Sequence, residues 1–122
     1  MSDRKRMIAV VDDDPRLLES LENLFESAGH AVRTFSSAKA LIEAGWSDID
    51  CLITDIGMPV MDGFELHDLA KKARPGLPVF LITGRHEIGD QQRANAKDIN
   101  GFFRKPFDGP ALLAAIGEVL RT

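Results

Sequence analysis

Five short apolar runs alternate with amphipathic stretches along the chain, and this alternation constrains the fold more than any other feature. The first run, Ile8–Val11, is continuous, as expected of a strand whose two faces are both buried. Further short apolar runs follow, each after an amphipathic stretch, and together the runs predict strands at residues 8–11, 31–35, 51–54, 78–83 and 102–103. Strands that alternate with helices predict a parallel sheet covered by helices on both faces. The run at 31–35 alternates polar with apolar residues more than the others, which is typical of an edge strand.

Capping residues mark the expected helix boundaries. Asp14 followed by Pro15 predicts the start of the first helix, and Asp62 is expected to cap the third. The segment 87–97 is polar and has a poor apolar stripe, so the fourth helix has the weakest pattern. Residues 1–122 are therefore expected to form one α/β domain, a doubly wound five-stranded parallel sheet.

The composition excludes several classes of protein. The chain has 122 residues, a net charge of −4 and a pI of about 5.3, which argues against direct binding of nucleic acid. No stretch approaches the roughly 20 apolar residues of a membrane helix, and the first apolar run is too short for a signal peptide. We therefore expect a soluble, cytoplasmic domain. The single cysteine, Cys51, is expected to be a buried and inert thiol.

Polar residues stand at the carboxyl ends of four predicted strands. Asp12 and Asp13 follow the first strand, Asp55 the third, Thr83 ends the fourth and Lys105 follows the fifth. These ends lie at one edge of a parallel sheet, so the side chains should converge in one crevice. Three adjacent carboxylates would repel one another, and a divalent cation would relieve that repulsion. Oxygen-only ligands favour Mg²⁺, for which Mn²⁺ can substitute.

The same residues suit phosphoryl transfer. A carboxylate can attack a phosphoryl group to give an acyl phosphate, and this reaction depends mainly on charge neutralisation. Asp55 is the expected nucleophile, because Gly57 and Gly84 leave space around it. Lys105 would bind one phosphoryl oxygen, and Thr83 would bind another.

Four segments resemble the receiver domain of two-component response regulators, and the resemblance extends from Ile8 to Leu120. The segments are Val10–Pro15, Thr54–Gly63, Leu81–Gly84 and Lys105–Phe107. The resemblance implies a flavodoxin-like fold with strand order 2-1-3-4-5. It also implies a signalling domain rather than an enzyme, although such a domain catalyses its own phosphorylation and dephosphorylation.

Matched position by position, the resemblance implies a role for each acidic residue. Asp55 is the phosphorylation site. Asp13 is a direct Mg²⁺ ligand, and Asp12 acts mainly through water. The backbone carbonyl of Gly57 is the third protein ligand, beside Asp13 and Asp55.

The resemblance also implies a switch. Thr83 moves to hydrogen-bond the phosphoryl group, and Lys105 pairs with that group. The Lys105–Pro106 peptide bond is expected to be cis. Phe102 occupies the switch position, where it has no hydroxyl to guide its movement, and plain core packing of Phe102 remains the alternative. Arg85 and Gly57 lie where residues flank the attacking water, so the phosphoryl lifetime stays open.

The implied phosphoryl donor is a sensor histidine kinase. An output domain or a downstream effector protein is a further expected partner, and a homodimer is left open. The three histidines, His30, His67 and His86, lack metal-binding spacing and are expected to be surface or hydrogen-bonded residues, with His86 close enough to Thr83 to line the crevice.

Three alternatives remain. One is a phosphorylation-independent interaction module with the same fold, although such domains usually lose a site residue. A second is a haloacid-dehalogenase-type phosphatase, whose opening motif Asp12-x-Asp14 mimics, but Arg16 stands where that family has Thr or Val. A flavin-binding domain is disfavoured, because an aspartate triplet would repel a phosphate.

Overall fold

The protein forms a five-stranded parallel sheet, described by a computed structural model for residues 5–84 and 88–120. The strands, in chain order, are β1 (Met7–Val11), β2 (Ala31–Phe35), β3 (Cys51–Asp55), β4 (Val79–Thr83) and β5 (Gly101–Arg104). Their order across the sheet is β2-β1-β3-β4-β5, and every neighbouring pair is parallel. The predicted fold class is confirmed, and β2 lies at an edge as its alternating sequence indicated.

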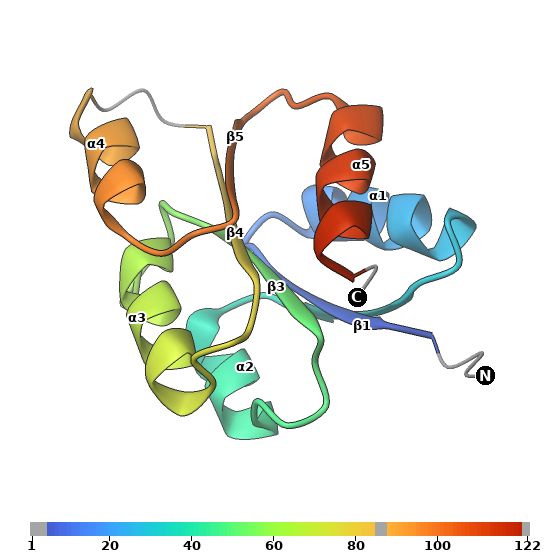
Figure 1. Cartoon of the computed structure of the whole chain (residues 1–122), viewed down its shortest axis with the longest axis horizontal. Helices are drawn as coiled ribbons and strands as arrows, with labels where there is room; N and C mark the ends of the chain where they lie inside the picture. Colours follow the sequence, from blue (N-terminus) through green and yellow to red (C-terminus); the bar gives the residue numbers. More distant parts are fainter. Residues whose placement is uncertain (1–4, 85–87, 121–122) are drawn as a thin grey trace.

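Five helices cover the two faces of this sheet (Figure 1). They are α1 (Pro15–Ser27), α2 (Ala38–Ala44), α3 (Gly63–Ala73), α4 (Ile88–Ala96) and α5 (Gly109–Leu120). Side chains of α1 and α5 pack in one apolar cluster, and side chains of α2, α3 and α4 pack in another on the opposite face.

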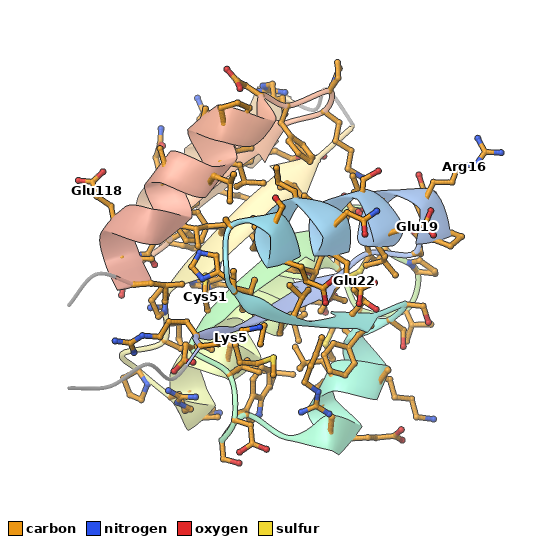
Figure 2. All side chains as sticks on the ribbon, turned by 90° about the vertical axis from the view of Figure 1, so that its right-hand side faces the viewer. Lys5, Arg16, Glu19, Glu22, Cys51 and Glu118 are labelled. Carbon is orange, nitrogen blue, oxygen red and sulfur yellow. The ribbon has the colours of Figure 1, made fainter. Side chains whose placement is uncertain are left out.

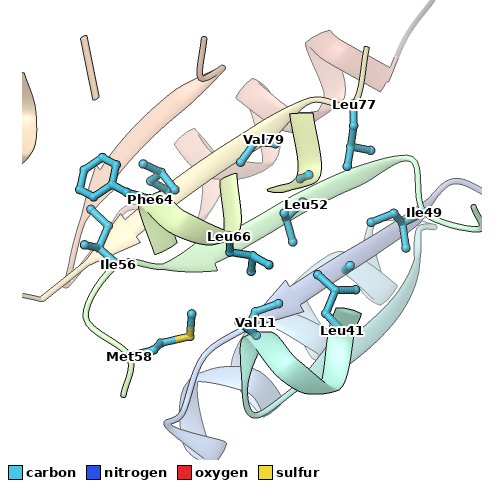
Figure 3. Close-up of a cluster of buried hydrophobic side chains, with 14 of the residues drawn as sticks. Val11, Leu41, Ile49, Leu52, Ile56, Met58, Phe64, Leu66, Leu77 and Val79 are labelled. Atoms are coloured by element: carbon cyan, nitrogen blue, oxygen red, sulfur yellow. The ribbon is translucent and has the colours of Figure 1, made fainter. Parts of the chain in front are cut away.

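Alternate residues of each central strand supply the two clusters. In β1, Ala9 and Val11 face α2 and α3, whereas Ile8 and Val10 face α1 and α5. Figure 3 shows the cluster under α2, α3 and α4, in which Val11 lies near Leu41 of α2 and Leu66 of α3. Because both faces are covered, both sets of alternating residues must be apolar, which explains the continuous runs in the sequence.

Cys51 belongs to the cluster under α1 and α5 and is fully buried (Figure 2). Burial raises the pKa of its thiol to about 12, and the nearby Asp50 adds to this shift. The structure therefore confirms that the thiol is buried, and we expect a buried thiol with a raised pKa to be unreactive. On the outside of the same helices, Glu19 and Glu118 are exposed to solvent.

The helix starts use local capping side chains. Asp14, Ser37 and Asp62 each accept a hydrogen bond from a backbone N–H in the first turn of α1, α2 and α3. In α3, Glu65 completes a capping box by accepting from the backbone N–H of Asp62 at 3.0 Å. The capping roles predicted for Asp14 and Asp62 are confirmed.

The helix α4 has few buried side chains. In the part of it whose side chains are described, only Asp90 and Ala94 are buried. Its further contact to α3 is made by the Arg93 guanidinium, which lies 4.0 Å from the centroid of the Phe64 ring. Among the described residues, no helix is long and apolar enough to cross a membrane.

Candidate functional site

The ends of β1 and β3 bring three carboxylates together. Asp12 follows directly after β1, and Asp55 is the last residue of β3, the strand next to it. Together with Asp13, they offer carboxylate oxygens that all lie within 4.8 Å of one another. Asp12 is fully buried and Asp55 is 5% exposed, whereas Asp13 is exposed to solvent. The convergence predicted from the strand ends is therefore present.

The amine of Lys105 lies between two of these carboxylates. Its Nζ is 2.9 Å from Oδ2 of Asp12 and 3.4 Å from Oδ1 of Asp55. The other oxygen of Asp12, Oδ1, accepts a hydrogen bond of 2.8 Å from the backbone N–H of Asp14. Both carboxylate oxygens of Asp12 are thus engaged, and Asp12 is held in place.

Backbone contacts position Lys105. Its N–H donates to the carbonyl of Thr83 at 2.7 Å, which extends the pairing of β4 with β5 by one residue. The peptide bond between Lys105 and Pro106 is cis. Gly84 lies beside the lysine stem, and a Cβ at Gly84 would stand 3.6 Å from the Lys105 Cδ. These contacts direct the amine toward the acidic cluster.

The cluster carries more negative charge than its lysine can balance. Burial, followed by the charge of Asp12, raises the pKa of the Asp55 carboxyl above its usual range. Burial also raises the pKa of Asp12, although its hydrogen bond with Lys105 acts in the opposite direction. Burial lowers the pKa of Lys105, but the two carboxylates outweigh this effect and raise it. Three carboxylates and one amine leave two uncompensated negative charges when all are ionised, and a divalent cation would match them.

The donor set at this edge fits a hard cation. Carboxylate oxygens are the ligands that Mg²⁺ prefers, and it usually binds one or two of them while it retains waters. Gly57, whose carbonyl was predicted to be a further ligand, is exposed and lies in the wall of the adjoining cavity.

A cavity of about 750 Å³ opens next to Asp55. It is lined by Asp55, Gly57, Met58, Pro59, Val60, Asp62, Glu65, Thr83, Gly84 and Lys105. Asp12 and Asp13 are not among the lining residues, so Asp55 is the acid of the cluster that borders this open volume.

Position 63, beneath the backbone of Asp55, has room only for a glycine. A Cβ at Gly63 would overlap the backbone oxygen of Asp55 and would stand 2.9 Å from the Cα of Ile56. The N–H of Gly63 donates to the carbonyl of Ile56 at 2.9 Å. The first turn of α3 therefore packs directly against the backbone that carries Asp55.

The remaining predicted residues lie in different places. Thr83 lines the cavity and is 1% exposed. Phe102 is half-buried in β5, away from the cavity, and packs against the cluster under α2, α3 and α4. Asp14 caps α1 through its side chain, which is the role expected for it. Arg85 and His86 lie outside the described residues.

The sequence did not indicate the role of Val60. Val60 is fully exposed and has φ +71°, a conformation that β-branched residues rarely adopt. The N–H of Met61 donates to the carbonyl of Pro59 at 2.8 Å, so the chain makes a γ-turn around Val60 that shapes one wall of the cavity. A proline followed two residues later by Met-Asp-Gly was the available signal for a tight turn.

A comparison with protein families identifies the family to which the fold belongs. The family model described as the response regulator receiver domain matches residues 8–117. The chain belongs to the response regulator receiver family. Receiver domains are the signalling modules of two-component systems, and the five-stranded order found here is their flavodoxin-like fold.

Individual relatives agree with this assignment. The response regulator protein TodT of Pseudomonas putida is 36% identical over 122 residues, a match that covers 99% of this chain and 54% of TodT. The transcriptional regulatory protein GlrR of Escherichia coli is 36% identical over 121 residues, covering 98% of this chain and 27% of GlrR. The structure of the chemotaxis protein CheY4 of Vibrio cholerae matches with a TM-score of 0.84 and 27% identity, covering 96% of this chain and 100% of CheY4. The receiver domain thus spans about half the length of TodT and about a quarter of GlrR.

Proposed function

We propose that this receiver domain accepts a phosphoryl group on Asp55 in a Mg²⁺-dependent reaction and changes its partner-binding surface when it is phosphorylated. The observation that carries the proposal is the position of Asp55. It borders the open cavity, and it lies 3.4 Å from the Lys105 amine and within 4.8 Å of the carboxylates of Asp12 and Asp13.

Asp55 is a better nucleophile than its neighbour Asp12. Both oxygens of Asp12 are engaged, one by the N–H of Asp14 and one by Lys105, and Asp12 does not border the cavity. Asp13 is exposed but lies outside the cavity wall. An incoming phosphoryl group therefore meets the Asp55 carboxylate first.

The residues around Asp55 have separate roles in the proposed reaction. The Asp55 oxygen forms a bond to phosphorus while the bond from phosphorus to a donor histidine nitrogen breaks, and that nitrogen keeps the electron pair. The Lys105 amine moves from the Asp55 carboxylate to a phosphoryl oxygen, and the Thr83 hydroxyl donates to another. In hydrolysis, water attacks the same phosphorus while the bond from phosphorus to the Asp55 oxygen breaks, which releases inorganic phosphate and restores the carboxylate. The domain thus contributes to both its phosphorylation and its dephosphorylation.

Asp12, Asp13, Asp55 and the Gly57 carbonyl would hold the Mg²⁺ ion, and Mn²⁺ would be a substitute. When bound, the cation supplies neutralisation of the charge that the carboxylates and the phosphoryl oxygens bring together. The fold keeps the carboxylates of Asp12 and Asp55 buried, whereas Asp13 is open to solvent.

Thr83 and Phe102 connect the site to the surface. Leu81, two residues before Thr83 in β4, pairs with Phe102 in β5, so a shift of Thr83 toward a phosphoryl group acts on the strand that contacts Phe102. Repacking of Phe102 would shift the population between two arrangements of β5 and α4.

The proposed donor is a sensor histidine kinase in the cytoplasm, and the proposed target is an attached output domain or a separate effector protein. TodT and GlrR are named as regulators and are longer than the part that matches this chain, which is consistent with an attached output domain.

Intact-mass measurement after incubation with acetyl phosphate tests phosphate uptake. With Mg²⁺ we expect one phosphoryl group per chain, and without Mg²⁺ none. The variant Asp55→Asn should take up none, whereas the control Asp14→Asn, at an exposed helix cap, should behave as wild type. A domain that stays unlabelled under all conditions would be the phosphorylation-independent interaction module. Catalytic turnover of a phosphate ester would instead indicate the phosphatase.

A further inference from the structure

The outer side of α2 and α3 carries an apolar surface that the proposed phosphorylation does not use. Among the described residues, two large hydrophobic side chains are exposed, Val60 at 105% and Leu69 at 38%. Each borders an apolar hollow in this surface, and Ile42 of α2 lines both hollows. Single exposed apolar residues are common in soluble proteins, but a contiguous apolar patch marks an interaction site.

The first hollow lies between the start of α2 and the loop before α3. It has a volume of about 390 Å³, and its apolar lining consists of Ala38, Ile42, Pro59, Val60 and Met61. Pro59 and Val60 also line the cavity beside Asp55. A molecule bound in this hollow would therefore touch the loop that forms one wall of that cavity.

The second hollow lies between the end of α3 and the segment after α2. It has a volume of about 280 Å³ and is lined by Ile42, Trp46, Leu69, Lys72 and Ala73. Helices that connect parallel strands run in the same direction, so the two hollows follow one another between α2 and α3 (Figure 1). We call them together the α2–α3 groove. The 11 residues of α3 give it a length of about 16 Å, or about three helical turns.

The backbone holds Val60 outward in an unfavourable conformation. Its φ of +71° is rare for a β-branched residue, and the exposed side chain gains no burial in return. Residues held in such sparsely populated conformations cluster at binding and active sites. The exposed valine is therefore a second indication that this surface has a ligand.

The charged side chains that line the groove are lysines. Lys39 lines the first hollow and Lys72 the second, and neither amine has a hydrogen bond or ion pair in the part of the chain that the structure describes. The acids Glu43 and Asp68 are exposed nearby but line neither hollow, and Asp68 is paired with Lys97. The groove is thus positively charged, although the chain as a whole carries a net charge of −4.

The charge and shape of the groove distinguish between its conceivable occupants. A second copy of this chain, docked through the same surface, would bring the lysines of both chains together, which is unfavourable. An anionic lipid surface is flat, whereas the hollows are recessed, and it would repel the net negative charge of the chain. An elongated apolar groove fits an amphipathic helix, which binds through apolar side chains on successive turns.

We propose that the α2–α3 groove binds an amphipathic helix of a partner protein. The apolar stripe of that helix fills the two hollows, with Val60 and Leu69 as the apolar contacts at their rims. Acidic side chains beside the stripe pair with Lys39 and Lys72. The proposal concerns the unphosphorylated domain and requires no step of the proposed function.

Two designed peptides of about 18 residues, long enough to be partly helical in water, test the proposal. Both carry leucines along one helix face. The first has glutamates beside the leucines, and the second has a lysine in place of each glutamate. Titrated into the nitrogen-15-labelled, unphosphorylated domain, the acidic peptide should shift the amide signals of Ile42, Val60 and Leu69. It should bind about tenfold more tightly than the basic peptide, and salt at about 0.5 M should reduce this preference.

The variant Val60→Asn separates binding from folding. Asparagine adopts a positive φ more readily than valine, so the variant should be at least as stable as wild type in urea. It should nevertheless bind the acidic peptide about fivefold more weakly, because an apolar contact is lost. An equal affinity of Val60→Asn and wild type would remove Val60 from the interface and overturn the proposal.

The double variant Lys39→Gln with Lys72→Gln tests the charge complementarity. It should remove most of the preference for the acidic over the basic peptide. The control Arg16→Gln removes an exposed cation at the start of α1, on the other face of the sheet, and should leave the preference unchanged (Figure 2).

The proposal is wrong if neither peptide binds at concentrations up to about 1 mM, if both bind equally, or if the shifted signals lie outside the groove. Binding to vesicles of anionic phospholipid without binding to the acidic peptide would indicate a membrane surface instead. Dimerisation that Val60→Asn abolishes would indicate a second copy of the chain, and either result overturns the proposal. Phosphorylation takes no part in these measurements, so their failure would leave the role of Asp55 untouched.

Discussion

At the scale of single residues, the site combines repulsion between buried carboxylates with a close contact between Gly63 and the backbone of Asp55. Lys105 offers one amine to two buried carboxylates, and the pKa values of Asp12 and Asp55 are raised in spite of it. Below them, Gly63 leaves no space for a side chain. Both features concern residues at or next to the site of the proposed reaction, and each can be tested separately by substitution.

Replacing Gly63 with alanine should destabilise the domain. The added Cβ would overlap the Asp55 carbonyl oxygen, so α3 or the end of β3 must shift, and we expect a loss of about 2 kcal/mol in the free energy of unfolding. Urea denaturation measures it. The control is Gly76→Ala, where a Cβ meets no atom within 4 Å, and it should change stability by less than about 0.5 kcal/mol. Equal stabilities of the two variants would show that the contact at Gly63 is not tight.

Removing the amine with Lys105→Met should make stability depend more strongly on pH. Without Lys105 the carboxylates of Asp12 and Asp55 lose their partner, and their raised pKa values should rise further. The variant should therefore be about 2 kcal/mol less stable near neutral pH, a value reduced from that of a fully buried pair because Lys105 is partly exposed.

The sign of this effect follows from protonation. Carboxyl groups with raised pKa values add stability in acid and lose it as the pH rises, so the difference between Lys105→Met and wild type should shrink as the pH falls. Urea denaturation at a series of pH values, without Mg²⁺, measures the difference, and Lys72→Met at an exposed position of α3 is the control. If the stability difference between Lys105→Met and wild type were the same at all pH values, the idea that Lys105 offsets the repulsion between Asp12 and Asp55 would be wrong.

At the scale of elements, the strands hold the site and the helices differ in how firmly they are attached. Each central strand is buried on both faces, whereas α4 has few buried side chains in its described part. An element with few buried contacts opens at low free-energy cost, and α4 is adjacent to the strand that carries Phe102. This arrangement suits a segment that would move in the phosphorylation switch that we propose.

The variant Arg93→Ala should loosen α4 selectively. It removes the guanidinium that lies 4.0 Å from the Phe64 ring, a contact worth about 1 kcal/mol. Hydrogen exchange in the second half of α4 should become about fivefold faster, with exchange in β1 and β3 unchanged. The control Gln92→Ala alters a neighbouring exposed residue and should have little effect. Similar exchange in both variants would mean that Arg93 does not anchor the helix.

The sequence predicted the elements better than the details of the loops. The strands and the site depend on apolar runs and on the residues that follow them, and Asp12, Asp55 and Lys105 came together as those patterns predicted. The strand order was implied by the resemblance to receiver domains and is confirmed. The positive φ of Val60 had no comparable signal, because valine disfavours that conformation and only the surrounding fold imposes it. The hydrogen bond between the His67 ring and the backbone carbonyl of Asp98 was also beyond prediction, since Asp98 is 31 residues away and is brought near by the packing of α3.

At the scale of the whole molecule, a parallel sheet gathers residues from four strand ends into one site and connects that site to a distant surface. Thr83 ends β4 at the cavity. Leu81, two residues earlier in β4, pairs with Phe102 in β5. The same three carboxylates would bind the metal ion and, through Asp55, accept the phosphoryl group, so both processes would depend on the charges of this cluster. The account as a whole therefore depends on Asp55 being the residue that is modified.

Locating the phosphoryl group within the chain tests that claim most directly. After incubation with acetyl phosphate and Mg²⁺, borohydride reduction converts an aspartyl phosphate to homoserine, which tandem mass spectrometry of peptides assigns to a position. We predict homoserine at position 55 alone, and none when Mg²⁺ is withheld. Homoserine at position 12 or 13, or equal labelling without Mg²⁺, would contradict the account.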